Sequence, residues 1–443
     1  MLTTMQKTLL VILIGLFGGN YSVLLAADWK VGQSRVDITP AKNIWLAGYA
    51  SRKKPSQSTQ HPLWAKALVF EDPQGLRAVI VTTDLIGLTR EISDAVCKRV
   101  TNQTGISRAQ IMLNSSHTHC SPVVKGCAAL AYDFTPEQQK DVDDYAETLQ
   151  GKLVKVIVEA SQSLEPANLS FGEEKATFAI NRRGRINLDG PVDHSVPVLK
   201  VTDSEGKLRA ILFGYACHNT TIAQFEFCGD YAGFAQIAIE KQYPGTLAMF
   251  MLGCGGDANP HPRGTMELAE QHGTALAQAV SRAVEQKLDP VRGPLTVRFQ
   301  RTDLPFVAPP SKAELESQKG KGDVYNQRLT DYLLGQLKEQ GSIPTSYPFS
   351  AQIFEFGEDL TLIGLGGETV IDYAIRLHEE LSVKHLWVAG YCNEVFAYVP
   401  SERVLKEGGY EGGGAMKYFG WHGPFQPGVE DRIIKLIQTM LAQ

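Results

Sequence analysis

Short apolar runs alternate with longer amphipathic stretches along almost the whole chain, and this alternation constrains the fold more than any other feature. The apolar run at 76–84 precedes a helix-like segment at 91–101, and the run at 111–113 precedes a long amphipathic segment at 136–163. Strand-length runs followed by segments with helical periodicity are typical of α/β layering. We therefore predict an α/β fold with mixed β-sheets at the centre and helices packed on the outer faces.

One of these apolar runs stops abruptly at two histidines. The sequence Ile111-Met-Leu-Asn-Ser-Ser-His-Thr-His119 places His117 and His119 two residues apart. In a strand, residues two apart point to the same face, so both imidazoles converge on one site if strand geometry continues through Thr118. Neutral imidazole is a common zinc ligand, although an isolated His-x-His motif also fits a surface turn.

Three further apolar runs end near side chains that can bind a metal. The run at 210–215 ends shortly before His218, the run at 360–365 leads to Glu368, and the run at 386–390 leads into a polar turn that reaches Tyr398. Glu368 could instead cap a helix predicted at 369–381, because an acidic residue is favourable at a helix N-terminus. Together, strand ends with two imidazoles, a carboxylate and a phenol indicate a zinc site on a rigid scaffold.

A series of short motifs identifies a family that the chain resembles. In chain order they are Val31-Gly-Gln-Ser-Arg-Val-Asp-Ile-Thr-Pro40, Ser116-His-Thr-His119, Asn181-Arg182, Ala216-Cys-His218, Gly256-Asp-Ala-Asn-Pro260, Gly367-Glu368, Gly390-Tyr-Cys-Asn393 and Tyr410-Glu-Gly412. They resemble the neutral ceramidase family, the non-lysosomal zinc amidases that hydrolyse the N-acyl bond of ceramide. The resemblance implies zinc ligands at His117, His218, Glu368 and Tyr398, with His119 beside the metal, and it implies that Arg182 lines the substrate pocket.

One position departs from the family pattern. The family places a catalytic serine in the motif Gly-Asp-Val-Ser-Pro-Asn, whereas this chain reads Gly-Asp-Ala-Asn-Pro-His at 256–261, so Asn259 stands in the place of the serine. An amide side chain is not a usable nucleophile, and the serine mechanism therefore cannot be transferred. We expect Asn259 to orient substrate or water, and His261 to contact the substrate.

The expected chemistry is hydrolysis by metal-activated water. A zinc ion held by two imidazoles, one carboxylate and a weak phenol ligand keeps a position open for water or substrate. Asp257 and His119 are the candidate general bases. We assign proton transfer to His119, and we expect Asp257 to hold the second nitrogen of a zinc-binding histidine. Tyr398 is expected to stabilise the developing oxyanion, and Arg182 is expected to bind a substrate oxygen.

The first 27 residues predict export from the cell. Lys7 precedes an apolar run at 9–17, and small residues up to Ala27 lead into polar sequence, as in a signal peptide. The apolar core is too short for a comfortable membrane span. We expect a secreted or periplasmic domain at 28–443 with no stable membrane span after cleavage.

The cysteines are compatible with an exported protein. Seven cysteines cannot all pair within one chain, so at least one thiol is free. Disulfides between Cys120 and Cys127 and between Cys217 and Cys228 are conceivable, although small buried thiols are the other reading.

The segment at 308–340 breaks the composition of the chain, because two prolines lead into a lysine-rich stretch with weak helical periodicity. We expect a surface insertion there that forms a lid, a packing arm or simply a solvated helix. The formal net charge is −5 without a basic run, so nucleic acid is not an expected partner.

These observations predict a secreted zinc-dependent hydrolase that cleaves an amide or ester bond in a small-molecule, lipid or glycan substrate. One alternative is a sugar deacetylase or lactonase that acts in polysaccharide breakdown. Another is a catalytically inactive protein that binds zinc or carbohydrate. Nothing in the sequence specifies an oligomeric state.

Overall fold

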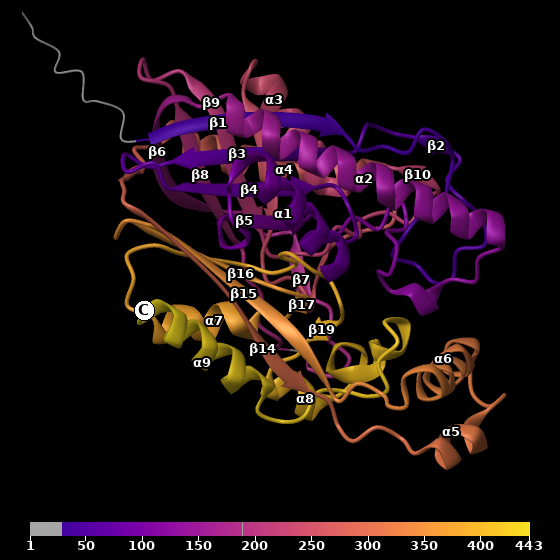
Figure 1. Cartoon of the computed structure of the whole chain (residues 1–443). Helices are drawn as coiled ribbons and strands as arrows, with labels where there is room; N and C mark the ends of the chain where they lie inside the picture. Colours follow the sequence, from indigo (N-terminus) through magenta and orange to yellow (C-terminus); the bar gives the residue numbers. More distant parts are fainter. Residues whose placement is uncertain (1–28, 188) are drawn as a thin grey trace, which may run out of the picture.

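The fold is built around two β-sheets of unequal size (Figure 1). The structure is a computed structural model that describes residues 29–187 and 189–443, so the predicted signal peptide at 1–27 lies outside the described residues. The larger sheet has nine strands in the order β11-β9-β8-β6-β1-β3-β4-β5, with β13 paired to β6. These strands are β1 (Trp29–Asp37), β3 (Trp64–Glu71), β4 (Arg77–Thr83), β5 (Ile111–Ser115), β6 (Glu165–Lys175), β8 (Ser195–Thr202), β9 (Leu208–Tyr215), β11 (Leu247–Leu252) and β13 (Asp289–Val291).

The smaller sheet has four strands in the order β14-β15-β16-β18, and three two-stranded pairs complete the β-structure. The four strands are β14 (Leu295–Pro305), β15 (Ser346–Phe356), β16 (Leu360–Leu365) and β18 (Leu386–Ala389). The pairs join β2 (Ser58–Thr59) to β10 (Glu226–Phe227), β7 (Ala179–Asn181) to β12 (Ala258–Pro260), and β17 (Glu368–Thr369) to β19 (Tyr398–Val399). Both large sheets are mixed, since β4–β5, β9–β11 and β16–β18 are parallel and their other neighbours are antiparallel.

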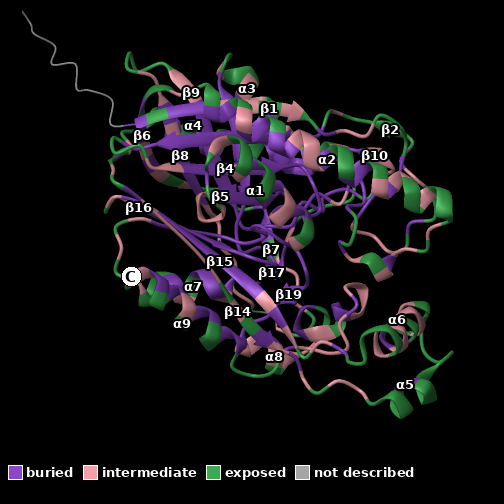
Figure 2. Ribbon diagram, in the orientation of Figure 1, coloured by how far each residue is buried: buried purple, intermediate pink, exposed green. Residues whose placement is uncertain are grey.

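The helices lie outside the two sheets. They are α1 (Arg90–Thr104), α2 (Pro136–Gln162), α3 (Asp230–Gln242), α4 (Met266–Glu285), α5 (Lys312–Gln318), α6 (Val324–Gln340), α7 (Asp372–Glu380), α8 (Glu402–Glu407) and α9 (Val429–Leu441). Helices α1 to α4 cover the larger sheet, while α7 and α9 cover the smaller one. Figure 2 shows buried strands at the centre and helices whose outward faces are exposed.

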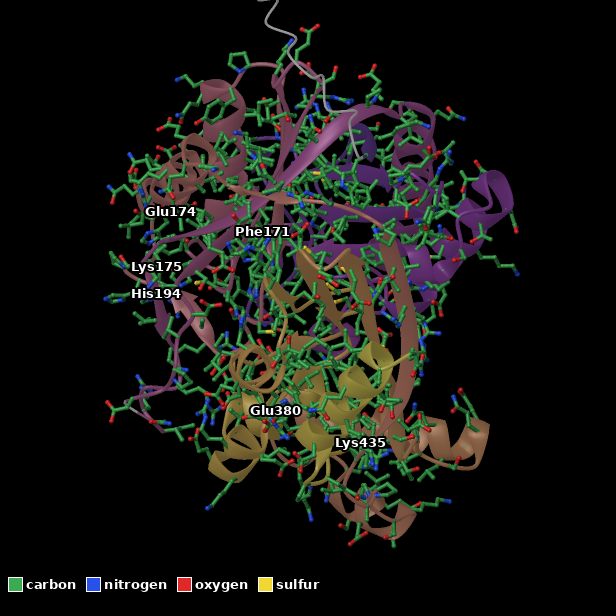
Figure 3. The ribbon with its side chains drawn as sticks, turned by 90° about the vertical axis from the view of Figure 1, so that its left-hand side faces the viewer. Phe171, Glu174, Lys175, His194, Glu380 and Lys435 are labelled. Carbon is green, nitrogen blue, oxygen red and sulfur yellow. The ribbon has the colours of Figure 1, made fainter. Side chains whose placement is uncertain are left out.

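Side-chain alternation along the strands creates a four-layer stack of helices, sheet, sheet and helices. In β4, Val79 and Val81 pack toward the helices, whereas Ala78 and Ile80 pack toward the smaller sheet. Successive strand residues point to opposite faces, so each sheet can bury both of its surfaces. Figure 3 shows the stack from the side, with Phe171 in the upper, larger-sheet half and Lys435 in the lower half.

The side chain of Asn114 connects the two edge strands of the larger sheet, β5 and β11. Its Nδ2 atom donates to the carbonyl of Leu252 at 3.3 Å, and its Oδ1 atom accepts from the Leu252 amide at 2.9 Å. Nδ2 also donates to the carbonyl of Gly390 at 2.8 Å, just after β18. These bonds bring the ends of β5, β11 and β18 together, and the polar residues that follow these strands therefore gather in one place.

The predicted α/β fold with mixed central sheets and outer helices is confirmed. Within the described residues, no helix is long and apolar enough to cross a membrane. All seven cysteines are free and buried, so the conceivable Cys120–Cys127 and Cys217–Cys228 disulfides are not formed. Their thiols face other groups: Cys127 approaches the carbonyl of Val395, and the Cys228 sulfur lies 3.3 Å from Nε2 of His61.

Candidate metal-binding site

Two histidines are oriented by backbone carbonyls. Nδ1 of His117 lies 2.6 Å from the carbonyl oxygen of Ile86, and Nδ1 of His218 lies 2.7 Å from that of Gly255. A carbonyl oxygen only accepts, so Nδ1 carries the proton on both rings, and Nε2 of each neutral imidazole presents a lone pair. This second-nitrogen bond is the arrangement that orients metal-binding histidines.

The free nitrogens of these histidines face the same carboxylate oxygen. Oε2 of Glu368 lies 3.1 Å from Nε2 of His117 and 3.2 Å from Nε2 of His218. The phenol oxygen of Tyr398 lies 3.2 Å from Nε2 of His218. Strands β17 and β19 pair Glu368 directly with Tyr398, so the two residues lie side by side. All four side chains are buried. The structure thus brings together the four residues that the resemblance implies as ligands.

His119 joins the same cluster, but not by the strand geometry that the sequence suggested. Strand β5 ends at Ser115, and His117 has a left-handed backbone with φ of 62°, so the strand geometry that was the condition for convergence does not continue through Thr118. The turn still places Nε2 of His119 3.2 Å from Nε2 of His117. Gly48 allows this packing, because a Cβ there would lie 2.3 Å from the His119 ring.

The three histidines by themselves form a group that could hold a metal ion, since their ligand nitrogens lie within 4.8 Å of one another. His119 is therefore a candidate ligand as well as a neighbour of the metal. Its Nδ1 atom is buried and has no hydrogen-bond partner in the protein.

The pKa shifts of Glu368, His218 and His119 favour the protonation states in which these side chains bind metal. Burial raises the pKa of Glu368, but His117 and His218 outweigh it and hold that pKa well below its usual range. Burial lowers the pKa of His218 to about 4, helped by the charge of Arg182. Burial also lowers the pKa of His119 well below its usual value, and the charges of His117 and His218 add to this effect. Neutral imidazoles and an ionised carboxylate are the protonation states that metals require.

The donor set fits a cation. Nε2 of His117, Nε2 of His218 and Oε2 of Glu368 all present lone pairs at separations of about 3 Å, with no proton left to place between them when the histidines are neutral. Unpaired polar groups are costly to bury, and a cation shared by these three atoms would satisfy all of them. Two imidazoles, a carboxylate and a phenol are ligand types that suit zinc.

A cavity of about 400 Å³ opens directly above this cluster. Its floor contains His117, His119, Glu368 and Tyr398. The remaining lining residues are of two chemical kinds. The small or aliphatic ones are Gly48, Ala50, Ser51, Ile86, Cys127, Ala128, Ala131 and Val395, and the aromatic ones are Tyr49, Tyr132, Tyr325, Tyr410, Tyr418 and Phe419. A pocket of this size, mostly apolar with a few convergent polar groups, is suited to a small-molecule or lipid substrate.

Comparison with known proteins identifies the family. A sequence model described as neutral/alkaline non-lysosomal ceramidase, N-terminal, matches residues 29–304. The chain belongs to the neutral/alkaline non-lysosomal ceramidase family. The resemblance predicted from the motifs is therefore confirmed, and the family is one of hydrolases.

Curated members of the family share modest identity with this chain. Neutral ceramidase B of Dictyostelium discoideum is 29% identical over 54% of this chain and 36% of its own length. The neutral ceramidase of Drosophila melanogaster is 25% identical over 73% of this chain and 46% of its own length. The chain thus spans less than half the length of these relatives.

Solved structures of ceramidases share the fold. The neutral ceramidase from Pseudomonas aeruginosa superposes with a TM-score of 0.75 at 21% identity, covering 94% of this chain and 74% of that chain. A ceramidase complexed with C2 gives a TM-score of 0.76 at 21% identity, covering 94% of this chain and 75% of that chain.

Asp257 does not have the role predicted for it. Its Oδ1 atom accepts from the backbone amide of Ile371 at 3.0 Å, and its Oδ2 atom accepts from Nδ2 of Asn181 at 3.0 Å. Because carbonyl oxygens hold Nδ1 of His117 and His218, Asp257 orients neither of them, and that prediction is wrong. Asp257 is fully buried and ties β7 to the start of α7, so its role here is to fasten the elements around the site.

Arg182 lies behind Tyr398 rather than in the cavity lining. Its guanidinium is 5.2 Å from the centre of the Tyr398 ring, and its Nε atom donates to Oε1 of Glu411 at 2.7 Å. Its Nη2 atom is buried without a protein partner. Arg182 therefore does not line the cavity as the resemblance implied, and its charge acts through the Tyr398 ring.

Asn259 and His261 are not among the residues that line the cavity. Asn259 lies in β12, where its Oδ1 atom accepts from the hydroxyl of Thr220 at 3.3 Å. His261 is exposed, and its backbone amide donates to the carbonyl of Phe178. The structure thus does not bring His261 to the site, and it gives Asn259 a hydrogen-bond partner in the neighbouring loop.

Several cavity residues were missed by sequence reasoning. Tyr49, Tyr132 and Tyr325 come from two separate loops and from α6, and none of them belongs to a motif. Tyr410 stands in the Tyr410-Glu-Gly412 motif, which is the single signal that could have drawn attention to it.

Proposed function

We propose that the chain is a zinc-dependent hydrolase that cleaves an amide or ester bond in an N-acyl lipid or a related acylated substrate. The observation that supports this proposal most strongly is the convergence of Nε2 of His117 and Nε2 of His218 on Oε2 of Glu368, at 3.1 and 3.2 Å, beside a cavity that His117 and Glu368 line. Membership of the ceramidase family and the names of its neutral ceramidase relatives support the same chemistry.

The ligands would be His117, His218 and Glu368, with Tyr398 as the weakest of the four. The carbonyls of Ile86 and Gly255 orient the two imidazoles, so little reorganisation is required when an ion binds. When bound, zinc supplies a Lewis acid that polarises the scissile carbonyl and acidifies water.

Proton transfer is assigned to His119. Its Nε2 atom lies in the cluster at the cavity floor, where it can accept a proton from an attacking water molecule and return it to the leaving nitrogen or oxygen. The neutral form of His119, favoured by its burial, is the form that accepts a proton.

Tyr398 and Arg182 are assigned to the developing negative charge on the substrate oxygen. Burial raises the pKa of Tyr398 well above its usual value, against the opposing effect of Arg182, so the phenol keeps its proton and can donate. A donor aimed at a developing oxyanion stabilises the transition state by ~3 kcal/mol.

Because Asn259 stands in the place of the catalytic serine, direct attack of water on the scissile carbonyl is the mechanism assigned to this chain. Its amide cannot form an acyl-enzyme intermediate. Its hydrogen bond with Thr220 supports a role in shaping the loop beside His218.

A second candidate function is a deacetylase or lactonase that acts on an acylated sugar. The tyrosines in the cavity lining favour it, because tyrosine rings present a flat apolar face together with a hydroxyl that can bond to sugar hydroxyls.

Hydrolysis assays with zinc-loaded protein test the proposal and separate the two candidates. N-acetylsphingosine and an acetylated monosaccharide serve as substrates, and release of acetate is measured. Tyr398→Phe should keep its zinc and lose about 10²–10³-fold in kcat. His385→Ala is the matched control, because this histidine pairs with Asp289 outside the site. Absence of hydrolysis of any acylated substrate by zinc-loaded wild type would refute the enzymatic function and favour a protein that only binds zinc or carbohydrate.

A further inference from the structure

Helix α6 contributes one side chain to the cavity, although it lies far from both sheets. Figure 1 draws α5 and α6 at the edge of the molecule, away from the sheets. Tyr325, in the first turn of α6, lines the cavity, and its hydroxyl donates to the carbonyl of Ala50 at 3.0 Å. The predicted insertion at 308–340 contains this helix, so the segment reaches the substrate cavity.

Helix α6 contacts three separate segments that form the cavity wall. Tyr325 bonds to the loop at 48–51 through Ala50. Arg328 donates to the carbonyl of Leu130 at 3.3 Å and pairs with Asp133 at 3.1 Å. Asp323, which caps the helix, pairs with Lys417 at 2.6 Å. One helix therefore connects walls that come from three distant parts of the sequence.

A row of aromatic rings leads from the candidate metal site to this helix. Ring centres are 5.3 Å apart for Tyr398 and Tyr410, 6.2 Å for Tyr410 and Tyr418, and 5.0 Å for Tyr418 and Tyr325. Tyr398 is buried at the inner end of the row, and Tyr410 is 48% exposed along it. The row offers a continuous amphipathic surface from the reacting centre to the outside.

The attachment of α5 and α6 is independent of the main cores. Leu315, Leu333 and Ile343 form a small cluster of their own, apart from the clusters around the sheets. The ion pairs to the body are partly exposed, with Asp133 84% and Asp323 50% exposed at their side chains. Exposed pairs contribute little to stability, and α5 and α6 pack on a cluster apart from the metal site, so replacement of Tyr325 is expected to leave the scaffold of that site in place.

We propose that Tyr325 is a specificity-determining residue, and that α6 forms the outer wall of the binding surface for the amine or alcohol portion of the substrate. This inference rests on the proposed function. Ile86 and Val395 in the cavity lining suit an acyl group, whereas the tyrosine row offers hydroxyls to the portion that carries polar groups. A substrate with a short leaving group does not extend as far as Tyr325, and one with a long leaving group does.

Two substrates with the same acetamide bond test this assignment: N-acetylethanolamine, which is short, and N-acetylsphingosine, which is long. Tyr325→Ala should lower kcat/KM for the long substrate by about 10-fold, mainly through KM, and change the short one by less than about 2-fold, since loss of one stacking ring has this size. Tyr325→Phe retains the ring and should stay within about 3-fold of wild type for both.

Tyr332→Ala is the matched control, because Tyr332 also belongs to α6, is 43% exposed and does not line the cavity. Equal losses for both substrates in Tyr325→Ala, or the same selectivity change in Tyr332→Ala or Tyr325→Phe, would overturn the inference.

Failure of the proposed function is distinguishable from failure of this inference. If zinc-loaded wild type hydrolyses neither substrate, the hydrolase assignment fails, and binding of N-acetylsphingosine to the same variants is measured by calorimetry. Tyr325→Ala should then weaken binding by about 10-fold relative to wild type and to Tyr332→Ala. An unchanged Kd would overturn the role of Tyr325.

Discussion

Nε2 of His117 and Oε2 of Glu368 lie 3.1 Å apart, although the two residues follow strands of different sheets. His117 comes after β5 of the larger sheet, and Glu368 begins β17 two glycines after the end of β16 of the smaller sheet. An ion held between them would connect the two sheets of the stack. Metal binding is therefore expected to affect stability as well as activity.

Elemental analysis should find about one zinc per chain in the wild type and almost none in a His117→Ala, His218→Ala double variant, because two of the four ligands are removed. The control His385→Ala should keep its metal. Full zinc retention by the double variant, or wild-type protein without metal after zinc loading, would contradict the assignment.

Removal of the metal should also lower the thermal stability. Zinc present at 1,000 times its Kd adds ~4 kcal/mol to the free energy of unfolding of a protein that binds it only when folded. Chelation should therefore lower the Tm of wild type and of His385→Ala, and leave the double variant unchanged. Equal shifts in all three proteins would indicate that the chelator acts elsewhere.

His119→Ala should reduce kcat by ~10²–10⁴-fold if His119 transfers the proton, while zinc content stays the same. Zinc content must be measured together with kcat, because Nε2 of His119 lies 3.2 Å from Nε2 of His117, close enough for His119 to act as a ligand. Loss of zinc together with activity would show that His119 binds the ion and would remove the support for its separate role.

Asn259→Ala should leave measurable turnover if water attacks the substrate directly, because no nucleophile is lost. The hydrogen bond to Thr220 is lost, so a modest effect through the loop beside His218 is expected. Asn259→Ser should not by itself produce efficient ceramide hydrolysis. An acyl-enzyme trapped on any side chain, or strong ceramidase activity in the serine variant, would show that the nucleophile is wrongly assigned.

Asp230 should make stability depend on pH. Burial raises its pKa from 3.8 to about 6, so the folded protein keeps a proton that the unfolded chain releases between these values. The stabilisation from this group is complete below pH 4 and is lost as the pH rises through about 6.

Comparison with Asp230→Asn isolates this effect, because both proteins share the same metal site and the asparagine does not titrate. The difference in unfolding free energy between wild type and variant should decline by ~2–3 kcal/mol from pH 4 to pH 7. Unfolding free energies are measured by urea denaturation. A difference between wild type and variant that stays constant from pH 4 to pH 7 would contradict the raised pKa of Asp230.

Local sequence was sufficient to predict the layered α/β fold and the strand ends that carry polar residues. Hydrophobic periodicity is a local property, so the run before His218 and the run before Glu368 were visible without any structure. The motifs were also local, and they identified the family that the sequence comparison then confirmed. Asn259 was likewise visible as a departure, because the residues around it matched the family pattern.

Tertiary structure decided which atoms meet. The left-handed turn at His117, the carbonyls that hold its Nδ1 atom and that of His218, and the bonds of Asp257 to Ile371 and Asn181 all join residues far apart in sequence. The same is true of Tyr325, which reaches the cavity because α6 packs on three loops. Sequence patterns record the burial and periodicity of single elements, whereas hydrogen bonds and cavity walls depend on how those elements pack together.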